Sequence, residues 1–284
     1  MSRGLSTISY SPPLMVQENI PPCRRPIKSL RICILYLVDY QFTSLKRKYH
    51  RDGVTLIGGD ALAIRTITRI RAISEEYAKK NKYDFVIVDT SPSLGALNKA
   101  VISTVDGFFV PAAPDMFSLY GIRNIGSSMR KWKEEFDIIY KLISADKRKL
   151  FPQDFVRFLG YTIYNAKKYT KPGSKWNLAQ AHLKYALQIP AIISAHIGND
   201  LVNNADEQVL SSPIGEEAVM HSHNTFPTLA QHYRVPMWKI AKMNGSLDKD
   251  HQNTINGQKP DILATKDKYI EFSKALLERI EQVG

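Results

Sequence analysis

Residues 83–125 read YDFVIVDTSPSLGALNKAVISTVDGFFVPAAPDMFSLYGIRNI, and this stretch decides the fold. It opens with a short, mostly β-branched run at 84–88, which is typical of a strand buried on both faces inside a parallel sheet. Residues 94–104 can form a helix, residues 107–111 form a second apolar run, and residues 118–136 are compatible with a longer helix. Alternating strands and helices with short connections predict a βαβ crossover in an α/β domain.

An acidic residue, Asp89, ends the first strand of this stretch. Open α/β sheets bind ligands at the carboxyl ends of their strands, and a carboxylate there can hold a hydrated Mg²⁺ against nucleotide phosphates. Alternatively, Asp89 caps the helix that follows, a role that Ser91 or Ser93 could also fill. The spacing alone leaves both interpretations open.

Two ordered motifs in the same stretch resemble the ParA/MinD family of partition ATPases. In that family the Walker B strand ends in Asp-x-x-Pro-x-Leu-Gly, and the next strand ends in Pro before a Leu/Tyr-Gly helix start. The matching residues here are Asp89, Pro92, Leu94, Gly95, Pro111, Pro114, Leu119 and Gly121. A weaker resemblance extends over roughly 53–280 and does not cover the first fifty residues.

The resemblance implies a three-layer P-loop-NTPase-like α/β domain with a mostly parallel sheet. We expect this ParA-like domain at 51–284, with strands near 54–57, 84–88, 107–111 and 157–164. Residues 1–50 form an atypical N-terminal arm in place of the phosphate-loop region, so the N-terminal strand region is expected to be incomplete or replaced. A predicted strand at 31–38 can fill the place of a lost one.

The family's chemistry depends on a glycine-rich Walker A loop, and no such loop is found. Gly58 and Gly59 follow the strand at 54–57, but no Gly-Lys-Ser or Gly-Lys-Thr comes after them to supply the phosphate-binding lysine. ATP and Mg²⁺ are implied by the resemblance, but a Walker B carboxylate without a phosphate cradle predicts a weak or inactive ATPase. The alternatives are a non-enzymatic DNA-binding or adaptor protein on the same scaffold, or the product of a truncated or frameshifted gene.

Polar and basic residues follow the strand at 157–164. In the family, an Asn at the end of the corresponding strand often contacts the adenine base, which makes Asn165 the candidate base reader; an ordinary turn residue is the alternative. Lys167, Lys168, Lys171 and Lys175 come next, interleaved with Tyr169 and Trp176. This pattern predicts nonspecific DNA binding, whereas an exposed, solvated loop would have the same composition.

The composition of the chain agrees with a polyanionic partner. Lys and Arg number 39 against 27 Asp and Glu, a net charge of +12, which favours nucleic acid first and an anionic membrane surface second. No apolar run is long enough for a transmembrane segment, and with two cysteines a disulfide framework is excluded. We expect a cytoplasmic protein, and the resemblance implies a homodimer and a centromere-binding partner protein.

Two interpretations concern the C-terminal third. His221, His223 and His232 lie near one another in the sequence, but no acidic or Cys residue is placed to complete a metal site with them, so no metal is expected there. Residues 248–260 are polar and predict a loop, before a terminal amphipathic helix at 265–283.

Overall fold

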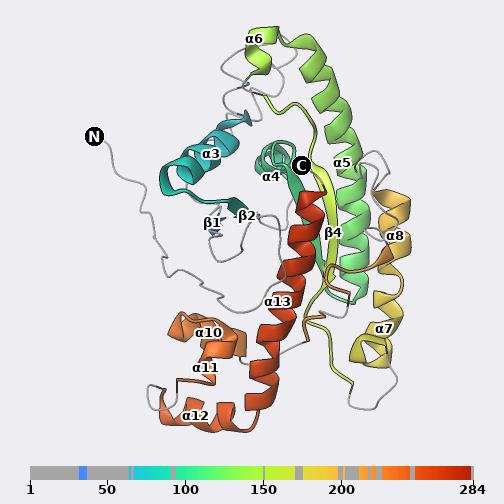
Figure 1. The fold of residues 1–284 in the computed structure, drawn as a ribbon. Coiled ribbons are helices and arrows are strands. Elements are labelled where there is room, and N and C mark those ends of the chain that lie inside the picture. Colours follow the sequence, from blue (N-terminus) through green and yellow to red (C-terminus); the bar gives the residue numbers. More distant parts are fainter. Residues whose placement is uncertain are drawn as a thin grey trace.

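The structure is a computed structural model that describes residues 32–36, 64, 67–90, 94–149, 151–169, 175–197, 201, 211–216, 219–221, 226–243 and 247–282 (Figure 1). Its elements, in chain order, are β1 (Ile32–Tyr36), α3 (Arg69–Asn81), β2 (Phe85–Asp89), α4 (Ala96–Ile102), β3 (Gly107–Ala112), α5 (Met116–Leu142), α6 (Ala145–Arg148), β4 (Arg157–Ile163), η3 (Lys175–Asn177), α7 (Gln180–Ala186), α8 (Ile189–His196), α10 (Phe226–Tyr233), α11 (Met237–Ile240), α12 (Lys249–Asn256) and α13 (Lys259–Glu281). Apart from β1, the predicted arm at 1–50 lies outside the described residues, as does the predicted strand at 54–57.

The four described strands form two parallel pairs. β1 pairs with β2, so that Ile32 lies opposite Phe85 and Tyr36 lies opposite Asp89. β3 pairs with β4 along its whole length, from Gly107 to Ala112. The predicted α/β fold with parallel pairing is therefore confirmed, and the predicted strand at 31–38 is confirmed over Ile32–Tyr36. Instead of one continuous sheet, the described strands form two sheets of two strands each.

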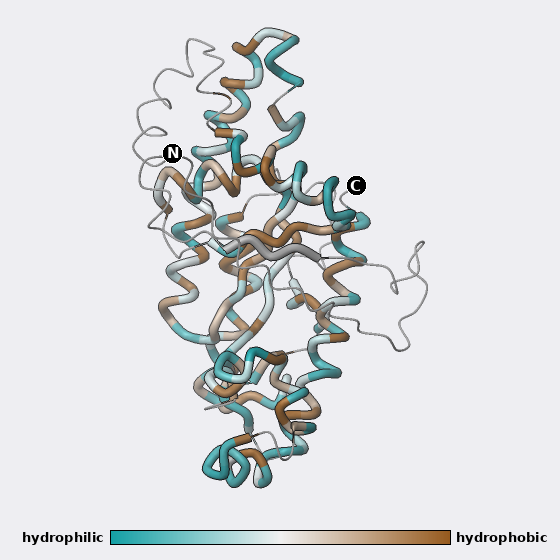
Figure 2. Tube along the Cα trace, turned by 90° about the vertical axis from the view of Figure 1, so that its left-hand side faces the viewer, coloured by the Kyte–Doolittle hydropathy of each residue, from teal (hydrophilic) through white to brown (hydrophobic). Residues whose placement is uncertain are grey.

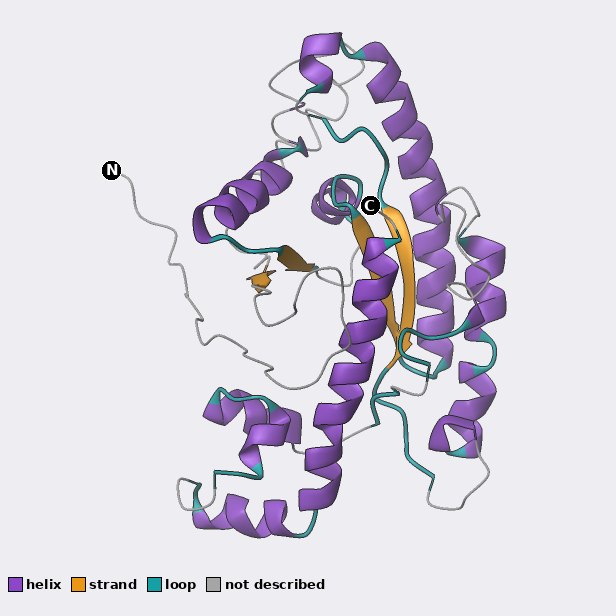
Figure 3. Cartoon of the chain, viewed as in Figure 1, coloured by secondary structure: helices purple, strands orange, loops and turns teal. Residues whose placement is uncertain are grey.

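The expectation that the strand at 84–88 is buried on both faces is wrong. β2 is half-buried to exposed along its length, and Ile87 is 40% exposed. Among the described strands, β1 is the one that pairs with β2 (Figure 3). An apolar, β-branched run fits a pleated surface, but it does not fix how many strands flank it.

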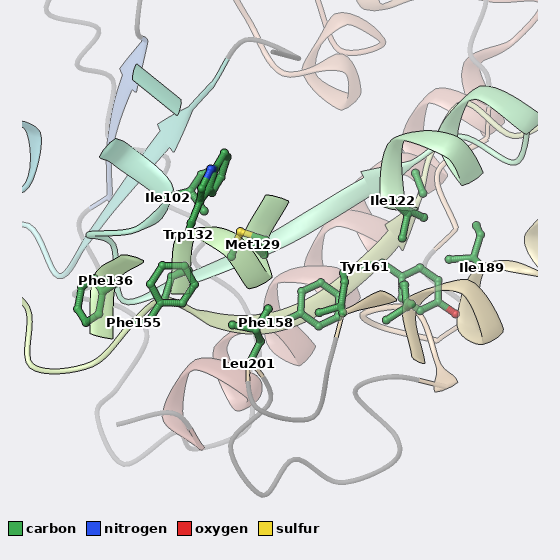
Figure 4. Close-up of a cluster of buried hydrophobic side chains, with 14 of the residues drawn as sticks. Ile102, Ile122, Met129, Trp132, Phe136, Phe155, Phe158, Tyr161, Ile189 and Leu201 are labelled. Carbon is green, nitrogen blue, oxygen red and sulfur yellow. The ribbon is translucent and has the colours of Figure 1, made fainter. Parts of the chain in front are cut away.

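Helices cover both faces of the β3–β4 sheet, which gives three layers in this part of the molecule. α13 packs along β4 on one side, and α5 lies on the other side with α8 packed against it (Figure 1). The buried residues of α5 recur every three or four positions: Leu119, Ile122, Gly126, Met129, Trp132 and Phe136. This spacing places them on one helix face. The apolar side chains among them meet Phe158 and Tyr161 of β4 in the main core (Figure 4).

α13 is anchored on β4 by one arginine. Arg279 Nη1 donates a hydrogen bond to the Leu159 carbonyl at 3.0 Å, and Nη2 donates to the Ser212 carbonyl at 3.2 Å. Gly160 makes room for it: its φ is +122°, and a Cβ at this position would collide with the Arg279 guanidinium. Desolvation by burial lowers the pKa of Arg279, and the interactions with Tyr161 and Glu216 oppose that effect.

A small helical unit is built from α10, α11, α12 and the first turns of α13. Its apolar core consists of Phe226, Leu229, Ile240, Ala241, Leu247, Ile255 and Ile262. The prediction of a loop at 248–260 is wrong, because Lys249–Asn256 form α12. This helix is mostly hydrophilic (Figure 2) and is held by Ile255, which is 1% exposed. One buried side chain carries no periodicity, which is why the sequence pattern missed the helix.

Candidate functional site

Asp89 lies at the carboxyl end of β2, as the sequence predicts. Its side chain is exposed, and no hydrogen bond or ion pair joins it to another described residue. The next helix, α4, has Gly95 at its N-cap position, so Asp89 does not cap it. An exposed carboxylate at the carboxyl end of a parallel strand is free to take part in Mg²⁺ coordination from the solvent side. The role of Asp89 as a metal ligand stays a prediction.

Asn165 follows the carboxyl end of β4 by two residues. Its φ of 53° lies in the left-handed region, which asparagine tolerates better than most residues, and its side chain is exposed. On either side of it, the Tyr164 N–H donates to the Ala112 carbonyl at 3.1 Å and the Ala166 N–H donates to the Met220 carbonyl at 3.2 Å. The residue therefore fills the turn role, and contact with a nucleotide base stays a prediction.

Asp89 and Asn165 belong to different sheets. Asp89 ends a strand of the β1–β2 pair, and Asn165 follows a strand of the β3–β4 pair. No hydrogen bond or ion pair between described residues brings these two side chains together. The sequence predicted the strand end at which each residue lies, but it did not predict that the two strands would fall into separate sheets.

The two described ends of the basic segment after Asn165, residues 167–169 and 175–179, pair with each other, and we call the segment 167–179 the lysine hairpin. Its base is fixed by two backbone hydrogen bonds: the Tyr169 N–H donates to the Asn177 carbonyl at 2.7 Å, and the Ala179 N–H donates to the Lys167 carbonyl at 2.9 Å. Lys168 and Leu178 form an antiparallel bridge between these two bonds, and Leu178 is fully buried. The hairpin is therefore anchored in the core at its base.

Three of the four predicted DNA-binding lysines lie exposed on the described part of the hairpin: Lys167, Lys168 and Lys175. Lys171 lies outside the described residues. Lys168 Nζ forms an ion pair with Asp261 Oδ1 of α13 at 2.9 Å, with side-chain exposures of 53% and 60%. Lys175 Nζ lies 4.5 Å from the centre of the Trp176 ring, a cation–π geometry. The Asp261 carboxylate of α13 thus balances part of the positive charge of the hairpin.

The two aromatic residues of the hairpin differ in accessibility. Trp176 is half-buried and packs against the main core, with its outer face towards Lys175. Tyr169 is 39% exposed. Base stacking is therefore more accessible to Tyr169 than to Trp176.

Sequence reasoning missed Asp261 as a neighbour of the hairpin, and it did not place His221, which it had grouped with His232, beside it. Asp261 follows Lys168 by 93 positions, and no local pattern connects them. His221 Nε2 lies 3.1 Å from the Trp176 carbonyl. Burial lowers the pKa of His221, Lys168 and Lys268 act in the same direction, and the backbone contacts with Trp176 and Asn177 oppose it.

A polar hollow of about 260 Å³ lies at the opposite, amino end of β4, and Phe136, Tyr140 and Arg157 contribute to its lining. Its charged groups are largely paired, since Lys133 Nζ lies 2.8 Å from Asp137 and Arg157 Nη2 lies 3.7 Å from Asp154. Because it adjoins the start of the strand, the hollow is separate from the strand end that carries Asn165.

Comparison with known proteins supports the resemblance seen in the sequence. Residues 53–141 match the family model described as an AAA domain. A stretch of 144 residues is 29% identical to the virulence plasmid ParA family protein pGP5-D of Chlamydia muridarum, covering 49% of this chain and 53% of that protein. Over about half of its length, the chain is thus similar to a ParA family plasmid protein.

The chain spans about half the length of that curated relative. Among solved structures, protein DIP2308 of Corynebacterium diphtheriae is similar at 21% identity and a TM-score of 0.47, over 58% of this chain and 55% of that one. Within the described residues, none of the helices combines the length and the apolar character needed to cross a bilayer.

Proposed function

We propose that this ParA-like chain acts in DNA partition and binds duplex DNA without sequence preference through the lysine hairpin. The observation that carries the proposal is the hairpin itself. Its base is held by backbone hydrogen bonds and a buried leucine, while Lys167, Lys168 and Lys175 are exposed beyond the end of β4. Lysine side chains neutralise phosphates whatever the base sequence, so recognition would be of the DNA backbone. The net charge of +12 supports the same partner.

The nucleotide part of the proposal rests on Asp89 and Asn165. Asp89 would hold Mg²⁺ and Asn165 would lie beside the base of ATP. Since the 284 residues contain no Gly-Lys-Ser or Gly-Lys-Thr run, the phosphates would lack a backbone cradle and its lysine. We therefore expect weak ATP binding by this chain and little or no hydrolysis.

The same missing motif favours a second candidate, a non-enzymatic DNA-binding or adaptor protein on this scaffold. The two candidates differ in one measurement, the binding of ATP by the purified chain in the presence of Mg²⁺. Binding that is lost in the Asp89→Ala variant supports the nucleotide-dependent protein. No binding by the wild-type chain leaves the non-enzymatic candidate. The cytoplasm, a homodimer and a centromere-binding partner complete the proposal, as the ParA resemblance implies.

DNA binding is tested by fluorescence anisotropy with a labelled duplex of arbitrary sequence. Replacing Lys167, Lys168, Lys171 and Lys175 together by Ala should weaken binding strongly and flatten its dependence on salt, because each phosphate contact contributes about 0.9 to the slope of log K against log salt.

The matched control removes the same charge elsewhere, from four exposed lysines on α3 and α5: Lys79, Lys80, Lys131 and Lys141. If this control weakens binding as much as the hairpin variant, net charge alone explains the affinity. The proposal is refuted if the wild-type chain does not bind DNA at low salt.

A further inference from the structure

Two histidines and one carboxylate meet in the helical unit, outside the site described above. His232 lies near the end of α10, Asp248 occupies the N-cap position of α12, and His251 lies in the first turn of α12. Their nearest nitrogen and oxygen atoms all lie within 4.8 Å of one another. Asp248 Oδ2 is 3.6 Å from His251 Nδ1 and 4.0 Å from His232 Nε2.

The sequence analysis excluded a metal site around His232 because no acidic residue appeared to complete it. The structure supplies two partners, Asp248 and His251, by folding α12 back beside α10. His221, which was grouped with His232 in the sequence, is engaged elsewhere with the Trp176 carbonyl. A three-residue set spread over two helices has no compact sequence motif, which is why it was missed.

The donor set is that of a borderline transition metal. Two imidazole nitrogens and a carboxylate oxygen suit Zn²⁺, whereas Mg²⁺ and Ca²⁺ prefer oxygen ligands alone. Zinc binds such ligands at about 2.0–2.2 Å, so neighbouring ligand atoms in a tetrahedral site are about 3.3 Å apart. The three groups therefore need small side-chain rotations to close on an ion. The side-chain exposures of His232 and Asp248, 59% and 72%, leave room for these rotations.

Tyr233 orders two of the three groups before any ion binds. Its hydroxyl lies 2.6 Å from His251 Nδ1 and 3.3 Å from Asp248 Oδ2, and it accepts a hydrogen bond from the Asp248 N–H at 3.1 Å. The His232 ring packs edge-on against the Tyr233 ring, with 4.7 Å between centroids. Because the Tyr233 hydroxyl occupies His251 Nδ1, it must release that nitrogen when an ion binds there, or the ring must turn to offer Nε2.

We propose that His232, Asp248 and His251 bind one Zn²⁺ ion, with water in the fourth position. The ion would join the end of α10 to the start of α12 and so stabilise the helical unit, whose own apolar core is small. This inference is independent of ATP and DNA, and its test measures neither.

The test uses the full chain after treatment with a chelator, and it measures binding by isothermal titration calorimetry and stability by thermal unfolding. We expect one Zn²⁺ per chain and a higher Tm with Zn²⁺, but no rise in Tm with Mg²⁺ or Ca²⁺. His232→Ala, Asp248→Asn and His251→Ala should each weaken Zn²⁺ binding at least about tenfold, since loss of a mere outer-shell partner already costs that much.

Two matched controls change the same residue types outside the cluster. His182→Ala removes a half-buried histidine whose Nδ1 accepts a hydrogen bond from the Lys167 N–H, and Asp250→Asn removes a carboxylate two positions from Asp248; both should bind Zn²⁺ as the wild type does. His232→Gln serves if the Ala variant proves unfolded by circular dichroism. The proposal is overturned if the wild-type chain takes up no stoichiometric Zn²⁺, or if His182→Ala lowers the affinity as much as His232→Ala.

Discussion

Replacing Asp261 by Asn removes the negative charge that pairs with Lys168, while the size of the side chain at position 261 stays nearly the same. In the structure, Lys168 Nζ and Asp261 Oδ1 lie 2.9 Å apart, and both side chains are more than half exposed. An exposed ion pair of this kind contributes at most about 1 kcal/mol. A DNA phosphate can therefore compete for Lys168, but to bind this lysine it must displace the Asp261 carboxylate.

The expected magnitude follows from counting the available lysines. With Lys168 held by Asp261, the remaining three hairpin lysines, Lys167, Lys171 and Lys175, give a slope of log K against log salt near about −2.7; with Lys168 free, the slope approaches about −3.6. Removing a competing pair worth at most about 1 kcal/mol should also tighten DNA binding by up to about fivefold at low salt. Asp261→Asn is thus expected to bind DNA more tightly than the wild type.

The assay is the anisotropy titration of a labelled duplex between about 50 and about 200 mM NaCl. The matched control is Asp267→Asn, which removes the same charge from another exposed position on α13. If Asp261→Asn and Asp267→Asn steepen the slope equally, the effect is one of net charge. If Asp261→Asn leaves both slope and affinity unchanged, Lys168 does not contact DNA and the reasoning is wrong.

Two further predictions concern stability. Gly160→Ala places a side chain at a φ of +122° and against the Arg279 guanidinium, so the free energy of unfolding measured in urea should fall by about 1–3 kcal/mol. The control is Gly121→Ala on α5, where an added Cβ would have no atom within 4 Å, and it should raise the free energy of unfolding by about 0.8–1.0 kcal/mol. Equal changes in the two variants would contradict the reasoning. Burial lowers the pKa of His221, so as the pH falls below about 6.5, the ordinary histidine pKa, this residue takes up a proton in the unfolded chain before it does so in the folded chain, and the free energy of unfolding falls. Urea unfolding at neutral and at mildly acidic pH should show that His221→Gln loses less stability on acidification than the wild type. An equal loss in the two proteins would refute this.

Much of the fold follows from short-range sequence patterns. The apolar runs at 84–88 and 107–111 predict β2 and β3, whereas the predicted crossover that pairs these two strands in one sheet is not seen among the described strands, because each pairs with another strand. A residue at a strand end stays at that end whichever strands pair in the sheet, so the positions of Asp89 and Asn165 were also predictable. Their roles in binding nucleotide remain predictions.

Other features depend on contacts that no local pattern reveals. Whether β2 is central or at an edge depends on its neighbours, and Ile87 has the same identity in either case. The pairing of Lys168 with Asp261 joins residues 93 positions apart. The Zn²⁺ ligands come together only because a helix forms at 249–256, where polar composition predicted a loop. In each case tertiary packing, rather than propensity, decides the outcome.

α13 contacts β4 near one end and the lysine hairpin near the other. Near its end, Arg279 bonds to the Leu159 carbonyl in β4, and near its start Asp261 pairs with Lys168 beyond the other end of that strand. The eighteen helical residues between these two positions rise about 27 Å at 1.5 Å each. A shift of α13 by one turn, about 5.4 Å, would break both contacts, so the register that Arg279 gives to α13 on β4 decides whether Asp261 can pair with Lys168.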